Sequence, residues 1–217
     1  WPAEVEVVQG DLQDPQSLQN FLEAGCTVVN LAYLWAAGES GNLAATRNLI
    51  DACRKAQVRR LIHCSTAIVV GSVAEKRITE NTPCNPTSDY ESTKLKLEYE
   101  IINGARGYFD IVVLRPTSVV GPDALPLKKL TSDLVSGSRF MNYVKSCFLG
   151  RRRMNLVCVA NLVAAILFMV RYHANINGEV FIVSDDAAPA NNYADIERIL
   201  VRRLNGKGHI LPPIPLP

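Results

Sequence analysis

The stretch Tyr90-Glu91-Ser92-Thr93-Lys94 decides how this chain is interpreted, together with the earlier run Arg60-Leu61-Ile62-His63-Cys64-Ser65-Thr66. A tyrosine and a lysine four positions apart share one face of a helix, so we expect the Lys94 ammonium close to the Tyr90 phenol, where it would lower the phenol pKa. Thr66 stands at the end of a strand-like run, which in a parallel sheet brings its hydroxyl to the carboxyl edge. The pattern predicts a proton-transfer site, although Tyr-x-x-x-Lys also arises by chance on exposed helix faces.

The composition is that of one globular α/β domain. The 217 residues are 48% hydrophobic and 20% charged, which is sufficient for one sizeable core. A formal net charge of +2 gives no basis for nucleic-acid binding, and the short run Arg151-Arg152-Arg153 is typical of a solvated loop. We therefore expect a protein that does not bind nucleic acid.

The cysteines, histidines and apolar runs indicate a cytoplasmic protein without a metal or a membrane span. The six cysteines include no close pair, and several lie within apolar segments, which favours a reducing compartment. The three histidines are scattered, so no metal site is expected. No apolar run reaches membrane-spanning length, and nothing at the N-terminus resembles a signal peptide.

Apolar periodicity predicts alternating strands and helices. Continuous apolar runs, such as Thr27–Ala32, are typical of parallel strands that are buried on both faces. The turn-rich segment Val69–Ser88 is expected to be a surface excursion, and no regular pattern is evident between Gly121 and Asn155. Strands are expected at 5–8, 27–32, 60–66, 110–116, 155–159 and 178–184, and helices at 14–22, 41–57, from Tyr90 onward, at 160–172 and at 193–204.

Three motifs in this order resemble the extended short-chain dehydrogenase/reductase family, in its NAD-dependent epimerase/dehydratase branch, from about Val5 to Asp186. They are Ser65-Thr66 at a strand end, Tyr90 and Lys94 on the following helix, and Leu114-Arg115-Pro116-Thr117 closing the next strand. The resemblance implies an α/β fold with a Rossmann-like doubly wound parallel sheet and a small substrate-binding subdomain. Residues 1–122 would form the dinucleotide-binding part and 123–217 the substrate-binding part, with about 155–183 returning to the first.

The glycine-rich turn of dinucleotide-binding proteins is missing from the sequence. Gly38-x-x-Gly41 and Gly104-x-x-Gly107 lack both a third glycine and a preceding strand. In the family's strand order 3-2-1-4-5-6, the sequence would start at the third strand, which would orphan the strand at 5–8. We therefore expect further chain before Trp1.

The resemblance also implies NAD or NADP as cofactor, without a choice between the two. Asp11 and Leu12 match the adenine position, although a turn-capping role for Asp11 is an equal alternative. Asn42 matches a residue that buttresses the active site, and an asparagine there is also a good helix N-cap. The other cofactor residues implied are Leu31, Ala32 and Tyr33 for pyrophosphate and ribose, Tyr90 and Lys94 for the nicotinamide ribose, and the backbone at Pro116 for the carboxamide.

The implied reaction is hydride transfer at a carbon that bears oxygen. Tyr90 would be the acid/base, Lys94 would lower its pKa and hold the ribose hydroxyls, and Thr66 would orient the substrate oxygen. The substrate residues are taken to be Ser65, Ser118 and Arg153, of which Arg153 is a displaced substitute for the family's arginine because Met154 occupies the matching position.

The sequence favours epimerisation over dehydration. The family's dehydratases follow the active-site threonine with an Asp-Glu pair, and here Thr66 is followed by Ala67-Ile68. We therefore predict a homodimeric sugar-nucleotide epimerase, paired through helix 41–57 and the helix of Tyr90, with residues such as Leu95 at the interface. The alternatives are an NAD(P)H-dependent keto-reductase and a non-catalytic nucleotide-binding protein on the same fold.

Overall fold

The computed structural model describes residues 2–18, 21–75, 77–122 and 124–204, and its contacts divide the chain into two compact units. The first unit comprises Trp1–Arg115 with Ala165–Ile182, and the second comprises Pro116–Ala164 with Val183–Pro217. The first unit thus ends its N-terminal segment at Arg115, earlier in the sequence than the boundary that we predicted after residue 122. Residues 205–217, which the sequence assigns to the substrate-binding part, lie outside the described residues.

A four-stranded sheet forms the centre of the first unit. Its strands are β1 (Thr27–Asn30), β2 (Arg60–Cys64), β3 (Asp110–Pro116) and β6 (Glu179–Val183), in the order β1-β2-β3-β6. The β1–β2 and β2–β3 pairs are both parallel. The predicted α/β fold with a parallel sheet is thus confirmed, and the apolar runs of β1, β2 and β3 form strands as expected.

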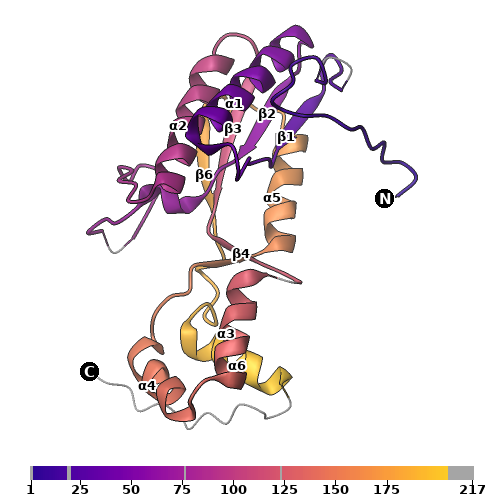
Figure 1. The fold of residues 1–217 in the computed structure, drawn as a ribbon. Coiled ribbons are helices and arrows are strands. Elements are labelled where there is room, and N and C mark those ends of the chain that lie inside the picture. Colours follow the sequence, from indigo (N-terminus) through magenta and orange to yellow (C-terminus); the bar gives the residue numbers. More distant parts are fainter. Residues whose placement is uncertain (1, 19–20, 76, 123, 205–217) are drawn as a thin grey trace. The chain divides into compact units, whose positions relative to one another are not determined.

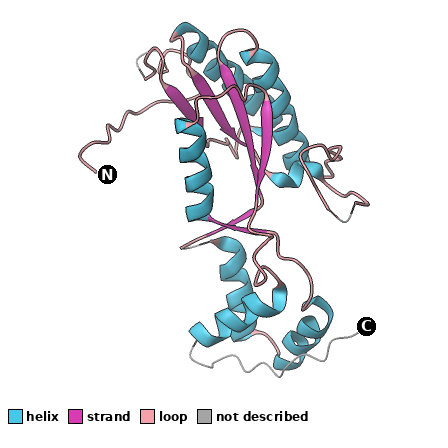
Figure 2. Cartoon of the chain, turned by 180° about the vertical axis from the view of Figure 1, so that it is seen from behind, coloured by secondary structure: helices cyan, strands magenta, loops and turns pink. Residues whose placement is uncertain are grey.

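Helices cover both faces of this sheet (Figures 1 and 2). One face carries α1 (Gly38–Lys55) and α2 (Asp89–Ala105), and the other faces α5 (Val159–Arg171), part of which belongs to this unit. Apolar side chains of the two layers fill the space between α1, α2 and the sheet. The core consists of Val28, Leu49, Ile50, Cys53, Val58, Leu61, Ile101, Ala105, Phe109, Ile111 and Val113.

In its described residues, the second unit contains two short strands, three whole helices and the first residues of α5. Strands β4 (Ser118–Val120) and β5 (Leu156–Cys158) pair in parallel. Helices α3 (Leu125–Ser136), α4 (Arg139–Leu149) and α6 (Tyr193–Arg203) contact one another. The sequence did not predict α3 and α4, because such short helices depend on packing against each other and on α6 more than on a long apolar stripe of their own.

Two expected elements near the N-terminus are wrong. Residues 5–8 form no strand, because a strand needs a partner and β1, the last strand of the sheet on that side, pairs only with β2. The helix expected from Asp14 is a series of turns over the described residues 14–18, where the Asp14 carboxylate accepts a hydrogen bond from the backbone of Gln16 at 3.0 Å. The aspartate therefore closes a local turn instead of starting a helix.

The surface excursion after β2 has its two ends fixed to each other. A 3-10 helix, Ala67–Val70, follows β2 and ends at Gly71, whose φ is +68°. Gly71 forms an isolated bridge with Asn85, and a Cβ at this position would lie 1.7 Å from the Asn85 carbonyl oxygen. Only glycine fits here, because both the backbone conformation and the close approach exclude a side chain.

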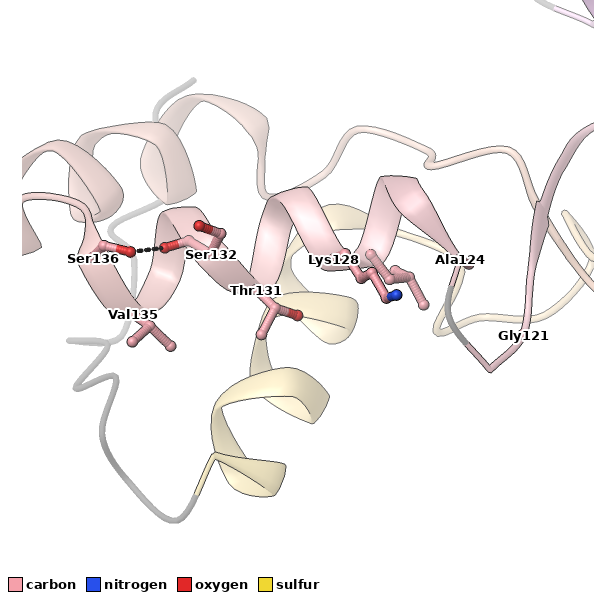
Figure 3. Close-up of a pocket in the computed structure, with 8 residues that line it drawn as sticks. Gly121, Ala124, Lys128, Thr131, Ser132, Val135 and Ser136 are labelled. Atoms are coloured by element: carbon pink, nitrogen blue, oxygen red, sulfur yellow. Dashed lines mark hydrogen bonds between the residues drawn. The ribbon is translucent and has the colours of Figure 1, made fainter.

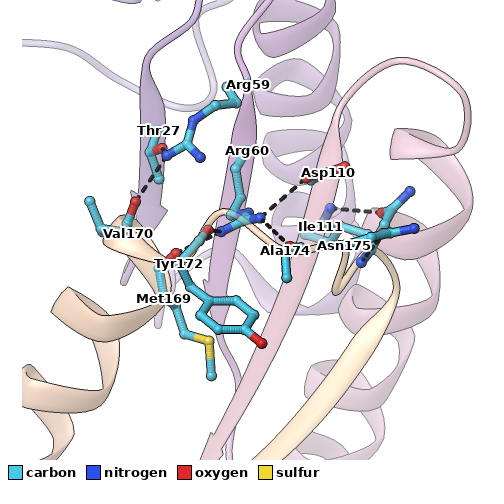
Figure 4. A network of polar contacts seen from close by, with 11 residues as sticks. Thr27, Arg59, Arg60, Asp110, Ile111, Met169, Val170, Tyr172, Ala174 and Asn175 are labelled. Carbon is cyan, nitrogen blue, oxygen red and sulfur yellow. Dashed lines mark hydrogen bonds and ion pairs between the residues drawn. The ribbon is translucent and has the colours of Figure 1, made fainter.

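Arg60, at the amino end of β2, ties the strand to α5 (Figure 4). Its side chain is 1% exposed and donates to the carbonyls of Met169 at 2.8 Å and Tyr172 at 2.5 Å. It also pairs with the Asp110 carboxylate at 3.2 Å. The guanidinium thus satisfies carbonyls near the C-terminus of α5 that have no partner within the helix.

Two further observations concern the described part of the chain. None of its helices combines the length and hydropathy needed to cross a membrane. Within the same residues, no three His, Cys, Asp or Glu side chains gather in a way that could hold a metal ion.

Candidate active site

Helix α2 begins with a capping box that fixes the position of Tyr90. The Ser88 hydroxyl accepts a hydrogen bond from the backbone N–H of Glu91 at 3.3 Å. The Glu91 carboxylate in turn accepts from the backbone N–H of Thr87 at 2.6 Å and from its hydroxyl at 3.0 Å. Tyr90 therefore lies in the first turn of a well-capped helix. The spacing Ser-x-x-Glu was available in the sequence as the signal for this start.

Lys94 connects α2 to the carboxyl end of β2. Its side chain is 3% exposed, and its ammonium donates to the Cys64 carbonyl at 2.9 Å. Cys64 is the last residue of β2, and α2 also contacts the 3-10 helix that begins directly after Thr66. The helix that carries Tyr90 is thereby joined to the strand end that leads into Ser65 and Thr66.

Ser65 and Thr66 differ in how their hydroxyls are engaged. The Ser65 backbone donates to the Leu114 carbonyl at 2.7 Å, while its buried hydroxyl has no hydrogen-bond partner in the structure. The Thr66 hydroxyl accepts from the backbone of Ile68 at 3.4 Å and caps the 3-10 helix. This weak bond leaves the Thr66 side chain able to bind another group.

An aromatic cluster surrounds the Tyr90 ring. Trp35 stacks on Tyr90 with ring centroids 5.4 Å apart and an interplanar angle of 9°. Tyr33 meets Tyr90 edge to face at 5.1 Å and Trp35 at 4.8 Å. Trp35 was not among the expected site residues, although two aromatic residues within three positions of the end of the expected strand 27–32 were a visible signal.

The pKa of Tyr90 departs from its ordinary value in the direction opposite to the one we expected. Burial raises the pKa of the phenol, and the neighbouring Tyr33 and Cys64 raise it further. Burial also lowers the pKa of the Lys94 ammonium. The expected lowering of the Tyr90 pKa by Lys94 is therefore wrong for this arrangement, because desolvation is the dominant effect and the ammonium is hydrogen-bonded to a backbone carbonyl.

His63, next to the strand end, is held neutral. Its ring Nδ1 lies 3.2 Å from the side-chain nitrogen of Asn30 on β1, so the Asn30 amide donates to it. Burial, and then the charge of Lys94, lower the pKa of His63 to about 3. A neutral imidazole beside Lys94 avoids placing a second positive charge in the core.

Asn42 holds the loop that carries the aromatic residues. It lies within α1, which begins earlier, at Gly38, with Ala37 as its N-cap, so the expected N-cap role for Asn42 is wrong. Its buried amide accepts from the backbone of Leu34 at 2.9 Å and donates to the Leu34 carbonyl at 2.9 Å. The amide thus fixes the backbone between Tyr33 and Trp35.

The residues expected at the cofactor's adenine have structural roles of their own. The Asp11 carboxylate accepts from the backbone of Gln13 at 2.8 Å, as a turn-capping aspartate does. The Leu12 carbonyl accepts from Asn48 of α1 at 2.9 Å, and Leu12 packs against the core. Adenine binding by these two residues stays a prediction.

The residues at the carboxyl edge fit a nicotinamide dinucleotide. Leu31 and Ala32 follow β1 directly and are exposed. Beyond the next strand, Ser65 offers an unpartnered buried hydroxyl and Lys94 a cation. Exposed apolar surface suits flat rings, and the hydroxyl and the ammonium suit ribose oxygens.

Pro116, Ser118 and Arg153, the other predicted site residues, belong to the second unit. Pro116 is the buried last residue of β3, and Ser118 is the exposed first residue of β4. The Arg153 guanidinium donates to the carbonyl of Asp186 at 3.0 Å. Arg153 therefore already has a structural contact within its own unit.

Helix α3 borders a shallow hollow of about 460 Å³ in the second unit (Figure 3). Hydroxyls and apolar groups alternate along it, and none of the predicted site residues lines it. Its lining consists of Gly121, Ala124, Leu127, Lys128, Thr131, Ser132, Val135 and Ser136.

Solved structures with the same fold can be aligned over almost the whole of this chain. The Bordetella bronchiseptica enzyme WbmG in complex with NAD and UDP aligns with a TM-score of 0.71 and 18% identity, over 99% of this chain and 67% of that chain. RMD from Pseudomonas aeruginosa complexed with NADPH aligns with a TM-score of 0.70 and 19% identity, over 97% and 78% respectively. These similarities show the fold.

Curated relatives match by sequence. Sterol demethylase protein B of Methylococcus capsulatus is 30% identical over 128 residues, which cover 54% of this chain and 39% of the relative. UDP-glucose 4-epimerase of Dictyostelium discoideum is 28% identical over 170 residues, covering 69% and 47%. The chain thus spans about half or less of the length of these relatives. The model of the NAD dependent epimerase/dehydratase family matches residues 1–184, and the chain belongs to this family.

Proposed function

We propose that this chain transfers hydride between a nicotinamide cofactor, NAD or NADP, and a carbon that bears an alcohol or ketone oxygen. The observation that carries the proposal is the Lys94 ammonium bound to the Cys64 carbonyl at 2.9 Å. This bond joins the helix of Tyr90 to the strand that leads into Thr66, at the edge where parallel sheets bind ligands. NAD in WbmG and NADPH in RMD support the choice of cofactor.

Each residue has one role in the proposed reaction. Tyr90 exchanges a proton with the substrate oxygen, Thr66 donates a hydrogen bond that orients that oxygen, and Lys94 would hold the ribose hydroxyls of the cofactor. Because burial raises the pKa of Tyr90, the phenol holds its proton and is prepared to act as the acid toward a ketone. The bound cofactor would supply or accept the hydride, and in an epimerase it would return the hydride to the other face of the keto intermediate.

A nucleotide sugar is the first substrate class, and epimerisation the first reaction. Family membership and the relative UDP-glucose 4-epimerase support this choice. Ala67 and Ile68 after Thr66 offer no carboxylate for the elimination of water, which speaks against dehydration. Ser65, Ser118 and Arg153 would contact the substrate.

Net reduction of an apolar ketone by NAD(P)H, or oxidation of the corresponding alcohol by NAD(P), is the second candidate. The residues that follow β1 and β2 include Leu31 at 65% exposure, Trp35 at 79% and Ile68 at 51%, so this edge is apolar. A relative whose name refers to sterol demethylation points the same way. This class needs no arginine for a diphosphate, which agrees with the structural contact of Arg153.

Product and cofactor stoichiometry distinguish the two candidates. The full-length protein is incubated with UDP-glucose and catalytic NAD, and separately with cyclohexanone and stoichiometric NADH or NADPH. A sugar epimer without net NADH formation supports epimerisation, and equimolar consumption of NAD(P)H with the ketone supports reduction. The matched variants are Tyr90→Phe, which should abolish turnover, and Tyr99→Phe on the exposed part of the same helix, which should not. Equal turnover of both variants would contradict the proposal.

We also propose that the protein is a homodimer and that it resides in the cytoplasm. The half-buried Leu43 of α1 and the exposed Tyr99 of α2 border a hollow of about 530 Å³ that a second copy would cover. Leu95, which we expected at this interface, is already buried by the chain itself, so it needs no partner. A monomeric mass by light scattering at micromolar concentration would count against the dimer.

A further inference from the structure

Trp35 combines exposure with a fixed position. At 79% exposure it is the most exposed large apolar side chain in the described ranges. One face of its indole lies against Tyr90, and Tyr33 contacts it edge to face. An exposed aromatic ring of this size is unfavourable in water unless a ligand covers it.

The backbone beside Trp35 is rigid. Asn42 binds both the N–H and the carbonyl of Leu34, and it also donates to the Gly38 carbonyl at 2.7 Å. The Leu34 carbonyl accepts a further bond from the backbone of Ala37 at 3.1 Å. The indole is therefore presented in one orientation, which lowers the entropic cost of binding to it.

Tyr33 and Trp35 contact the Tyr90 ring, and the Cys64 thiol lies close enough to the phenol to raise its pKa. The Lys94 ammonium lies 5.7 Å from the centre of the Tyr33 ring. The exposed Leu31 and Ile68 follow the ends of β1 and β2, at the same edge of the sheet. A ligand that reaches Tyr90 therefore meets flat apolar surface on its way.

We propose that Tyr33 and Trp35 form an aromatic wall that selects substrates whose oxygen-bearing carbon belongs to an uncharged alicyclic ring. The inference rests on the second candidate function, the reduction of an apolar ketone, and specifies the substrate class of that reaction. The C–H groups on one face of such a ring pack against the exposed indole, while the ring oxygen substituent extends to the Tyr90 phenol. A flexible acyclic ketone gains less from a flat surface and loses more conformational freedom on binding.

Binding to the wall can be measured without catalysis. The chain contains two tryptophans, Trp1 and Trp35, so the Trp1→Phe variant has Trp35 as its single tryptophan fluorophore. Cyclohexanone is compared with 2-hexanone, which has the same number of carbons and no ring, and with UDP-glucose. Cyclohexanone should change the fluorescence at a concentration about tenfold below that needed for 2-hexanone. The proposed aromatic wall would be wrong if the two ketones changed the fluorescence at equal concentrations, or if UDP-glucose alone changed it.

Kinetics provide the second measurement. Trp35→Ala should lower kcat/KM for reduction of cyclohexanone by about tenfold and change that for 2-hexanone by about twofold or less, whereas Trp35→Phe should keep most of the preference. Tyr108→Ala, which removes an exposed aromatic side chain just beyond α2, is the matched control. If Trp35→Ala still prefers cyclohexanone to 2-hexanone as strongly as wild type does, the inference is contradicted.

The two proposals can fail separately. If cyclohexanone alters Trp35 fluorescence in Trp1→Phe and also in the double variant with Tyr90→Phe, and no substrate is turned over, the wall stands and hydride transfer is wrong. If turnover depends on Tyr90 and ring ketones have no advantage, hydride transfer stands and the wall is wrong.

Discussion

The two ends of strand β2 differ in how far their side chains are bound and covered by the rest of the chain. At the amino end, both terminal nitrogens of the Arg60 guanidinium are bound to carbonyls near the end of α5 or to Asp110, while its Nε has no partner among the described residues; the side chain is almost completely covered. At the carboxyl end, Ser65 has a buried hydroxyl without a partner and Trp35 of the neighbouring loop is exposed. Both ends carry buried cations, Arg60 and Lys94.

The difference teaches where stability and function reside. Polar groups that are satisfied within the chain stabilise it and have nothing left for a ligand. Polar groups and aromatic rings without partners cost stability and are kept where a ligand can satisfy them. Changes at the amino end should therefore affect folding, and changes at the carboxyl end should affect activity.

The largest expected effect is on activity at the carboxyl end. Tyr90→Phe removes the proposed acid/base and keeps the stacking with Trp35, so kcat should fall about 10²- to 10⁴-fold with little change in Tm. The measurements are steady-state kinetics and thermal unfolding of the same preparations. A large loss of Tm together with activity would show that the phenol is structural, which would break the comparison.

The second prediction concerns His63, close to the same end. Its folded pKa, about 3, lies below the ordinary value of about 6.5, so the stability it contributes is present above pH 6.5 and is lost as pH falls toward 3. Between pH 6.5 and 4, wild type should lose about 3 kcal/mol more unfolding free energy than His63→Gln. Urea unfolding over this pH range measures the difference. Parallel pH profiles would mean that His63 does not titrate on unfolding.

A change at the amino end should lower stability alone. Arg60→Met leaves carbonyls near the end of α5 without their donor, which should cost about 3 kcal/mol of unfolding free energy. Activity per folded molecule should stay within about twofold of wild type. Arg47→Met is the control, because the Arg47 side chain is largely exposed and its ion pair with Glu100 should contribute little to stability. Equal losses in the two variants would contradict the structural role of Arg60.

The smallest effect is expected at the cap of α2. Ser88→Ala removes the hydroxyl that accepts from Glu91, which should cost about 1 kcal/mol, whereas Ser88→Asp should retain most of the stability. Because Tyr90 lies in this first turn, the alanine variant should also lose a few-fold in kcat. An unchanged kcat in Ser88→Ala would show that the capping box does not position Tyr90.

The elements with buried apolar runs could be predicted from the sequence. Strands β2 and β3 and helices α1, α5 and α6 lie within a few residues of their expected bounds, because burial imposes a clear periodicity. Alternation at residues 5–8 predicted a strand, yet no periodicity can report whether a pairing partner exists.

The site was predictable in part. The order of Thr66, Tyr90 and Lys94 indicated which residues lie on or beside β2 and α2. The direction of the Tyr90 pKa was not predictable, because it depends on burial and on Tyr33, which comes from a distant loop. The anchoring of Leu34 by Asn42 was also not visible, since it depends on α1 beginning four residues before Asn42.

The joined ends at Gly71 and Asn85 have a practical consequence for protein engineering. Because the bridge between them closes the excursion at its base, the intervening segment can change length without altering the path of β2 or α2. Loop closure becomes only slowly more costly with length, about 0.6 kcal/mol for each doubling. Ala74 and Glu75 are exposed within this segment, so a fluorescent peptide tag inserted between them would report on the neighbourhood of the site while leaving the sheet intact.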